Sequence, residues 1–283
     1  MSGKKYLRYL HFLLMFITNG LKVQTFLGNP VFFYLLRIIP KKYRLKAAFA
    51  LLSISPHYFF FNIAHESWKS SFKKYWEEIL KEHSRMKISR RALFDSLLKM
   101  HINGSSRIMD FGCGPGYLTF ISSEYAGKVI GYDISKGVLE CARILNDADN
   151  LLYIHSGKEG LSVFPGNYFD LIYSFAVFQH MPDGDVVRAL QDFKRILKPG
   201  GKLLCHIPVT EDHIPASSRV EVKSNWLWKR IHLFFFVRNK EDTIKMLERT
   251  GFRLDSCSVC KEHSSVKDDI FSQHIFVFTN RKE

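Results

Sequence analysis

The chain has 283 residues, of which 46% are hydrophobic and 24% charged, and this composition excludes a largely disordered protein. The formal net charge is +14, and residues 1–100 hold 18 Lys and Arg against 5 Asp and Glu, whereas residues 101–283 hold 23 against 22. The nearly neutral balance of the longer part disfavours tight binding to nucleic acid. Five cysteines, an odd number, argue against a disulfide framework and favour the reducing cytoplasm.

The basic first third of the chain is also rich in apolar and aromatic residues. Its apolar runs cover Tyr9–Thr18, Val31–Ile39 and Ala47–Ile54, and each is shorter than the ~20 residues that a membrane-spanning helix needs. We therefore expect residues 1–61 to form short amphipathic helices, which either lie on an anionic membrane surface or pack on the rest of the protein as a lid. Both interpretations fit the pattern.

Residues 87–283 are expected to form one α/β domain after a helical N-terminal region, residues 1–86. Ser89 precedes apolar residues at helical spacing, so we expect a helix to begin there. Short apolar runs then alternate with amphipathic stretches, which is typical of a mostly parallel sheet. The runs are Arg107–Phe111, Val129–Tyr132, Leu151–Ile154, Leu171–Ser174 and Leu203–Ile207. Two last runs, Phe252–Val259 and His274–Thr279, leave no room for a helix between them and should pair antiparallel at one edge.

A glycine-rich turn follows the first of these strands, in the sequence IMDFGCGPGYLTF. Gly112, Gly114 and Gly116 let the backbone turn tightly and approach a ligand, and the next helix is expected to begin near Tyr117. Their spacing is G-x-G-x-G, whereas a dinucleotide site such as that for NAD has G-x-G-x-x-G. The carboxylate of Asp110 would repel phosphate and suits the cationic amino-acid end of S-adenosylmethionine.

A second acidic residue, Asp133, ends the next strand 23 residues after Asp110, in the sequence GYDIS. At that position a carboxylate can accept hydrogen bonds from both hydroxyls of a ribose, and Ile134 would lie beside the adenine. The alternative is a surface aspartate that caps the helix expected near Ser135.

These motifs, with YFDLIYSFAVFQHMPD and LKPGGKLL, resemble the class I S-adenosylmethionine-dependent methyltransferases over residues 87–280. The resemblance implies a Rossmann-like, seven-stranded, mostly parallel sheet with an antiparallel last strand. It implies S-adenosylmethionine as cofactor and S-adenosylhomocysteine as product. The residues that it assigns are Asp110, Gly112, Gly114 and Gly116 at the methionine end, Asp133 at the ribose, Ile134 at the adenine, and Ser174 and Phe175 at the methyl-transfer face.

The sequence departs from the family pattern after the third strand, where HSGKEGL has Lys158 in the place of the acidic residue that many relatives set near the adenine amino group. Either Glu159 takes that role, or the backbone alone contacts the amino group.

His180 is the first candidate for a general base because its unperturbed pKa lies near neutrality, and the alternative is a structural histidine that fixes its loop. His206 is a second candidate. The family's quinone O-methyltransferases carry carboxylates one and four residues before the corresponding histidine, where this chain has Gln179 and Ala176, so no metal site is expected.

The sequence thus predicts methyl transfer from S-adenosylmethionine to a small-molecule or lipid-linked acceptor. Trp226, Trp228 and Phe234–Phe236 suggest an apolar acceptor, although packing in a core explains them nearly as well. We expect a cytoplasmic protein with a peripheral position on the inner membrane face through residues 1–61. A catalytically silent subunit at a membrane is the alternative, and a nucleic-acid methyltransferase is a weaker one.

Overall fold

A computed structural model describes residues 36–54, 72–211, 219–220, 235–260 and 272–281. Its helices are α4 (Lys41–Ile54), α6 (Phe72–Leu93), α7 (Tyr117–Ser123), α8 (Lys136–Leu145), α9 (Asp183–Ile196) and α11 (Lys240–Arg249). Its strands are β1 (Arg107–Phe111), β2 (Lys128–Asp133), β3 (Leu151–His155), β4 (Phe169–Ser174), β5 (Leu197–Thr210), β6 (Arg219–Val220), β7 (Phe235–Phe236), β8 (Arg238–Asn239), β9 (Phe252–Val259) and β10 (Ser272–Asn280).

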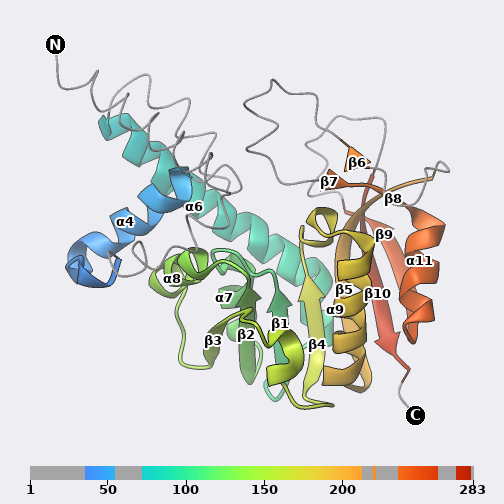
Figure 1. The fold of residues 1–283 in the computed structure, drawn as a ribbon. Coiled ribbons are helices and arrows are strands. Elements are labelled where there is room, and N and C mark those ends of the chain that lie inside the picture. The colour runs from blue at the N-terminus through green and yellow to red at the C-terminus, as the bar shows by residue number, and fades with distance from the viewer. Residues whose placement is uncertain (1–35, 55–71, 212–218, 221–234, 261–271, 282–283) are drawn as a thin grey trace.

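The central sheet has the strand order β3-β2-β1-β4-β5-β10-β9, and strands β1 to β5 pair in parallel (Figure 1). Strand β10 lies antiparallel between β5 and β9. The Rossmann-like sheet with an antiparallel last strand is therefore confirmed. An eighth strand that the sequence did not predict, the two-residue β8, pairs with the end of β5.

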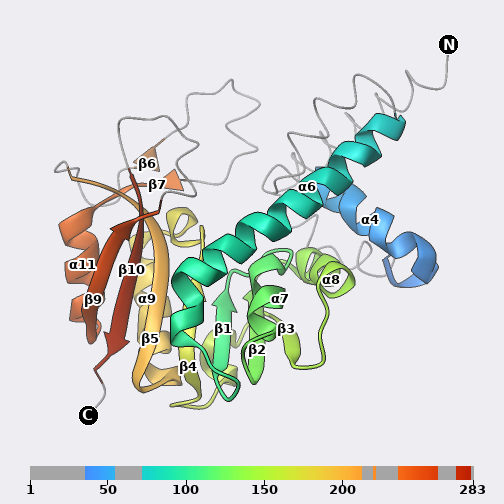
Figure 2. The ribbon, with the colours of Figure 1, turned by 180° about the vertical axis from the view of Figure 1, so that it is seen from behind.

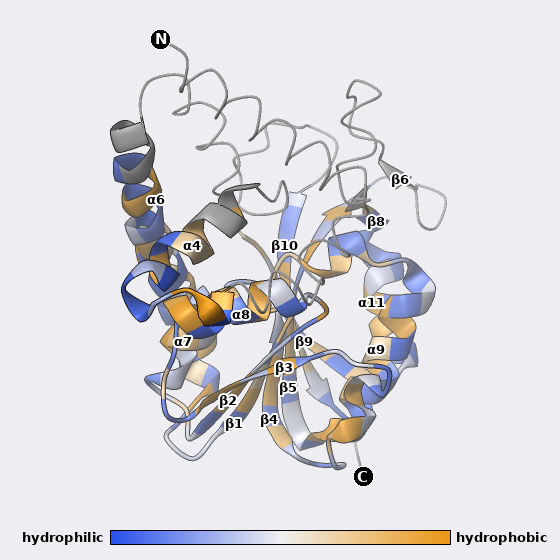
Figure 3. Cartoon of the chain, turned by 60° about the vertical axis from the view of Figure 1, so that its left-hand side comes forward, coloured by the Kyte–Doolittle hydropathy of each residue, from blue (hydrophilic) through white to orange (hydrophobic). Residues whose placement is uncertain are grey.

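Alternate side chains of the strands build a core on each face of the sheet. Met109 and Ile172 are buried with α9 and α11, whereas Ile108 and Leu171 are buried with α7 and α8. This alternation follows from the two-residue period of a strand. Figure 3 shows the sheet between α9 and α11 on one side and α6 and α7 on the other.

Helix α6 does not begin at Ser89, as the sequence predicted, but runs unbroken from Phe72 to Leu93. Its buried residues Ile79, Met86 and Leu93 are seven residues apart, so they form one continuous apolar stripe that holds the helix across Ser89. Figure 2 shows α6 crossing the sheet and continuing past it to lie beside α4. A boundary between residues 86 and 87 falls within this helix, and the division into two regions remains a proposal.

The described part of the basic N-terminal region packs on the α/β domain through α4. Ala48, Phe49 and Leu52 are buried in one cluster with Val138 and Cys141 of α8. This packing agrees with the lid interpretation for residues 36–54, while the rest of residues 1–61 lies outside the described residues. Among the described helices, none combines the length and the apolar character needed to cross a bilayer.

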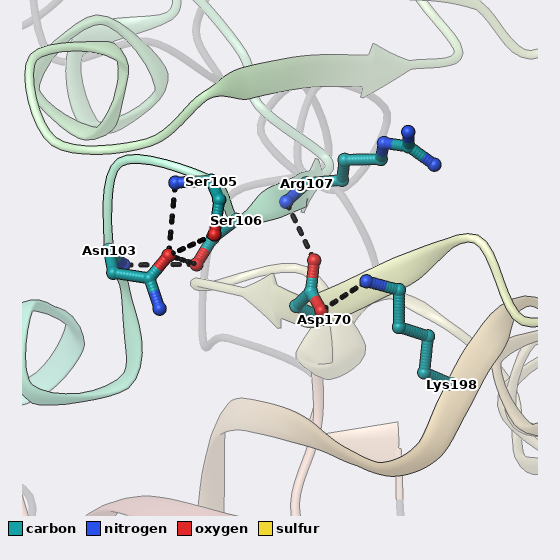
Figure 4. Close-up of polar contacts among 6 residues, drawn as sticks. All are labelled: Asn103, Ser105, Ser106, Arg107, Asp170 and Lys198. Atoms are coloured by element: carbon teal, nitrogen blue, oxygen red, sulfur yellow. Dashed lines mark hydrogen bonds and ion pairs between the residues drawn. The ribbon is translucent and has the colours of Figure 1, made fainter.

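A polar clamp joins three strands at the end of the sheet where β1, β4 and β5 begin (Figure 4). The carboxylate of Asp170 accepts hydrogen bonds from the backbone N–H of Arg107, at 2.8 Å, and from Nζ of Lys198, at 2.5 Å. The sequence motifs YFDLIYS and LKPGGKLL therefore meet in space. Because this end lies opposite the glycine turn, the clamp supports the fold rather than the chemistry.

Candidate functional site

The glycine turn leaves β1 with three residues in the left-handed region, at φ +77° for Gly112, +53° for Gly114 and +78° for Gly116. A Cβ on Gly116 would overlap the hydroxyl of Tyr153, and one on Gly112 would overlap Val177. The turn is thus closely packed from beneath, and only glycine fits its backbone. The helix that follows, α7, begins at Tyr117, as predicted, and no side chain caps its first turn.

Asp133 joins this turn to the start of α8. One carboxylate oxygen accepts the backbone N–H of Gly114 at 3.0 Å, and the other accepts that of Ser135 at 2.8 Å. The cap of α8 is Ser135, whose hydroxyl accepts the N–H of Val138, so the capping alternative does not describe Asp133. A carboxylate has about four acceptor positions, so it can accept a ribose hydroxyl in addition to these backbone groups. Burial raises the pKa of Asp133, while the hydrogen bonds from Ser135 and Gly114 oppose that rise.

Asp110 lies beneath the turn with 3% of its surface exposed. The hydroxyl of Thr119, on α7, donates to its carboxylate at 2.6 Å. Burial raises the pKa of Asp110 to about 7, against the opposing effects of Thr119 and of the positive charge of Arg90. Near neutrality this carboxyl therefore stands close to its point of half protonation, and a cationic ligand group beside it would favour the charged form.

A supporting layer that the sequence analysis missed holds the turn in place. The hydroxyl of Tyr153 donates to the carbonyl of Asn146 at 2.7 Å, and the amide of Asn146 donates to the carbonyl of Pro115 at 2.8 Å. Tyr153 also leaves no room for a side chain at Gly131 of β2. Because Leu152 is exposed, the alternation of a strand predicts that the next side chain, Tyr153, is buried. Nothing in the sequence shows that Tyr153 contacts the glycines.

The end of β4 brings further predicted residues to the same edge of the sheet. The hydroxyl of Ser174 donates to the carbonyl of Phe111 at 3.0 Å, which fixes β4 beside the glycine turn. The ring of Phe175 stacks on that of His206 with 4.3 Å between centroids, and the guanidinium of Arg90 lies 5.1 Å from the Phe175 centroid. The sequence analysis also missed Arg90, because it lies on α6, before the motifs.

His206 is buried, and its Nδ1 accepts the backbone N–H of Ala176 at 3.2 Å. Ala176 adopts φ +61°, an uncommon conformation for a residue with a side chain. The contact stabilises the bend after β4, so His206 has a structural role there.

His180 lies in a short helical turn, Phe178–His180, before α9. The side-chain amide nitrogen of Gln179 lies 3.1 Å from Nε2 of His180, which makes Nε2 the acceptor in the neutral ring.

Ile134, the residue predicted beside the adenine, is 59% exposed at the start of the loop before α8. Lys158 and Glu159 are both exposed. Among the described residues, no three His, Cys, Asp or Glu side chains gather as a metal site.

Comparisons with known proteins agree with this geometry. Residues 109–205, which include the glycine turn and Asp133, match the family described as "Methyltransferase domain". Residues 109–205 therefore form a methyltransferase domain, and the sheet has the class I S-adenosylmethionine-dependent methyltransferase fold.

Several relatives carry methyltransferase names. The ubiquinone biosynthesis O-methyltransferase of Dinoroseobacter shibae is 31% identical over 152 residues, which cover 51% of this chain and 59% of the relative. The demethylmenaquinone methyltransferase of Symbiobacterium thermophilum is 32% identical over 111 residues, which cover 37% and 43%. The chain thus spans about half the length of the curated relatives that it matches.

Solved structures show the same fold at low identity. The methyltransferase in a complex with the Haloferax volcanii Trm112 activator has a TM-score of 0.55 and 18% identity, and the match covers 71% of this chain and 95% of that one. Phosphoethanolamine N-methyltransferase 2 of Haemonchus contortus, in complex with S-adenosyl-L-methionine, has a TM-score of 0.52 and 20% identity, with 66% and 52% covered.

Proposed function

We propose that the protein transfers a methyl group from S-adenosylmethionine to a small-molecule or lipid-linked acceptor by in-line displacement. The observation that carries this proposal is the Asp133 carboxylate, which the backbone N–H groups of Gly114 and Ser135 hold beside the glycine turn. Bound S-adenosylmethionine supplies an electrophilic methyl group on a sulfonium. The names of the ubiquinone and menaquinone relatives support a small-molecule acceptor.

Different residues of the chain would bind different parts of the cofactor. Asp133 would bind the ribose, Ile134 would cover the adenine, and Gly112, Gly114 and Gly116 would leave room for the methionine end. Asp110, beneath the turn, would balance the ammonium group of that end, and Ser174 and Phe175 would border the methyl group.

His180 would accept the proton of the acceptor where the reaction needs a base. Because Gln179 approaches Nε2, that nitrogen must exchange the amide for the acceptor's hydroxyl or amine before it can take the proton. Orientation alone supplies about 7–11 kcal/mol in well-aligned reactions, so the aligned cofactor and acceptor carry most of the rate enhancement.

Calorimetric titration with S-adenosylmethionine, in parallel with NAD, tests the cofactor site. We expect S-adenosylmethionine to bind and NAD not to bind. Asp133→Ala should weaken binding by about 10- to 100-fold, since hydrogen bonds to a charged acceptor contribute ~1.5–3 kcal/mol. Lys128→Ala, an exposed change on the same strand, is the matched control. Equal binding by the wild type and Asp133→Ala would contradict the assignment.

A catalytically silent subunit is the second candidate, favoured by the proximity of Gln179 to His180. Tight binding of labelled cofactor without methyl transfer to any membrane, lipid, nucleic-acid or protein extract would support it. If the protein is an enzyme, His180→Ala should lose transfer to the extract while it keeps its affinity for the cofactor.

We further propose that the outer face of α4 rests on an anionic membrane at the cytoplasmic side. Lys41, Lys42 and Tyr43 are exposed there, and Ile38 is 73% exposed nearby. The described segment 36–54 contains no acidic residue. Basic and apolar side chains together suit the surface of such a bilayer, at about 1 kcal/mol for each Lys or Arg.

Sedimentation with phosphatidylserine-containing vesicles tests this surface. Lys41→Glu/Lys42→Glu changes the exposed face only, so α4 keeps its packing on α8. We expect the wild type to sediment with anionic but not with neutral phosphatidylcholine vesicles, less so in added salt, and the double variant to stay in the supernatant. Lys128→Glu/Lys245→Glu makes the same change in net charge elsewhere. Equal sedimentation of the two double variants would refute the α4 surface.

A further inference from the structure

Arg238 is a buried arginine that lies outside the glycine turn and the matched family region. It lies on β8, which pairs in parallel with the end of β5, so Arg238 is opposite Val209. Only 5% of its surface is exposed, and the adjacent Val237 is fully buried. A charged side chain at such a depth costs free energy unless it is paired and hydrogen-bonded.

All three nitrogens of the guanidinium donate hydrogen bonds to residues 178–183, the segment that contains His180. Nη1 donates to the carbonyl of Phe178 at 2.9 Å, and Nη2 donates to the carbonyl of Met181 at 2.5 Å. Nε donates to the carboxylate of Asp183, the first residue of α9, at 2.8 Å. The two carbonyls lie on either side of Gln179 and His180 in the chain.

We propose that Arg238 is the positioning residue for His180. The guanidinium donates hydrogen bonds to the backbone before and after His180, and it thereby fixes the orientation of the imidazole relative to the backbone. Only arginine offers a planar fork with donors in three directions, and the single ammonium of lysine cannot reach two carbonyls and a carboxylate together. This inference rests on the proposed role of His180 in methyl transfer.

The position of Arg238 in the chain gives the contact a second consequence. Asn239, its neighbour, caps α11 by accepting the N–H of Asp242 at 3.1 Å, and its amide lies 3.4 Å from the carbonyl of Glu211 at the end of β5. The dipeptide 238–239 therefore joins the His180 segment, β5 and α11. A rigid support from regular elements is what an active-site side chain on a loop needs.

The imidazole carbon–proton resonance of His180, assigned by its loss in His180→Gln, tests the proposal on the cofactor-free protein. Arg238→Lys keeps the charge and should shift this resonance. It should also speed amide exchange in residues 178–183 on the order of tenfold or more, while exchange in β1 and β2 stays unchanged. Arg188→Lys, on the exposed face of α9, is the matched control.

Rescue separates positioning from general support. Guanidinium ion at millimolar concentration should restore the His180 resonance in Arg238→Ala, and should leave the resonance of the wild type unchanged. Methyl transfer from labelled S-adenosylmethionine to a membrane extract should fall at least tenfold in Arg238→Lys, with its calorimetric affinity for the cofactor within twofold of the wild type. An unshifted His180 resonance with unchanged exchange in both Arg238 variants would overturn the proposal. Failure of the wild type to bind cofactor would overturn the proposed function instead and leave the resonance test valid.

Discussion

Asp110 combines a buried carboxyl group with a position beneath the glycine turn, and this makes stability depend on pH. Its pKa in the folded protein is about 7, raised by burial, whereas the unfolded chain has the ordinary value near 3.8. Between these values the folded state holds a proton that the unfolded state has released. The contribution of this group to stability is therefore complete below about pH 4 and is lost as pH rises through about 7.

Asp110→Asn removes this titration while it keeps the shape of the side chain. We expect the variant to gain stability relative to the wild type as pH rises from 5 to 7.5, on the order of 2–4 kcal/mol at about 1.4 kcal/mol per pKa unit. Urea denaturation at both pH values measures the difference. A constant difference between the two proteins would show that Asp110 is ionised at both.

Gly116→Ala should lose cofactor binding, and Gly104→Ala should not. A Cβ at Gly116 meets the Tyr153 hydroxyl and the backbone has φ +78°, whereas a Cβ at Gly104 has no atom within 4 Å. We expect Gly116→Ala to cost about 1–3 kcal/mol of stability, and the control to stay within about 0.5 kcal/mol. Thermal unfolding and calorimetry with S-adenosylmethionine measure both effects. Normal cofactor affinity in Gly116→Ala would mean that the turn can relax.

The sequence predicted these glycines and Asp133 because turn glycines and a strand-ending acid have local signatures. It could not predict Thr119, Tyr153 or Arg238. Each acts on a partner distant in the chain, and only the packed fold reveals the pair.

At the scale of elements, the Asp170 clamp joins β1, β4 and β5 away from the cofactor edge. Asp170→Ala should lower the free energy of unfolding by about 1–3 kcal/mol, because it removes charge-assisted hydrogen bonds to Arg107 and Lys198. Affinity for S-adenosylmethionine should stay unchanged. Asp192→Ala, which removes a half-exposed carboxylate on α9 that lies 3.4 Å from Nη2 of Arg195, is the control. Urea denaturation and calorimetry would contradict the separation of fold and site if both quantities fell together.

The contact between α6 and α7 should weaken in acid. His83 lies between Phe49 and Tyr117, and its Nδ1 is 2.6 Å from the Tyr117 hydroxyl. Burial, with the charge of Lys87, lowers the pKa of His83 to about 4. The neutral ring is thus favoured in the fold, and its contribution is lost as pH falls from about 6.5 through about 4.

Amide exchange in α6, followed at pH 7 and pH 5, measures this loss. We expect exchange, corrected for its intrinsic pH dependence, to speed up at pH 5 in the wild type and to change less in His83→Gln. Identical changes in the two proteins would place the acid sensitivity elsewhere.

Strand positions were the most predictable feature of the elements, since alternation of buried residues has a short period. The limits of α6 were not predictable. Ser89 is a residue type that often begins a helix, but the buried residues seven apart keep α6 continuous on both sides of it. The two-residue β8 has no pattern of its own and exists through pairing with β5.

For the whole molecule, α4 packs against the beginnings of the two helices that follow the cofactor turns. Tyr117 opens α7 and Val138 lies in the first turn of α8, and both share a cluster with Phe49. Bound S-adenosylmethionine should therefore slow tryptic cleavage within residues 41–46, by several-fold at saturation. The Asp133→Ala protein, with weakened binding, should show less protection at the same concentration. Equal cleavage with and without cofactor would mean that α4 docks independently.

Composition and charge predicted a basic region beside a neutral α/β domain, but they could not place that region on α8. The docking depends on Ala48, Phe49 and Leu52 facing α8 while the lysines of α4 are exposed, and a sequence with three apolar runs allows several such arrangements. Trp226, Trp228 and Phe234, which suggested an apolar acceptor, lie outside the described residues, whereas Phe235 and Phe236 form β7.

The place of β10 between β5 and β9 has a consequence for biosynthesis. The ribosome makes β5 some sixty residues before the strand that covers its edge. Asn280, at the end of β10, donates from its amide to the carbonyls of Lys194, Leu197 and Lys198. A nascent chain halted before residue 272 would thus expose an apolar strand edge with unpaired backbone groups, which is a template for aggregation. The sheet is therefore completed only once β10 has been made, and termination before residue 272 would yield a substrate for chaperones rather than a smaller working domain.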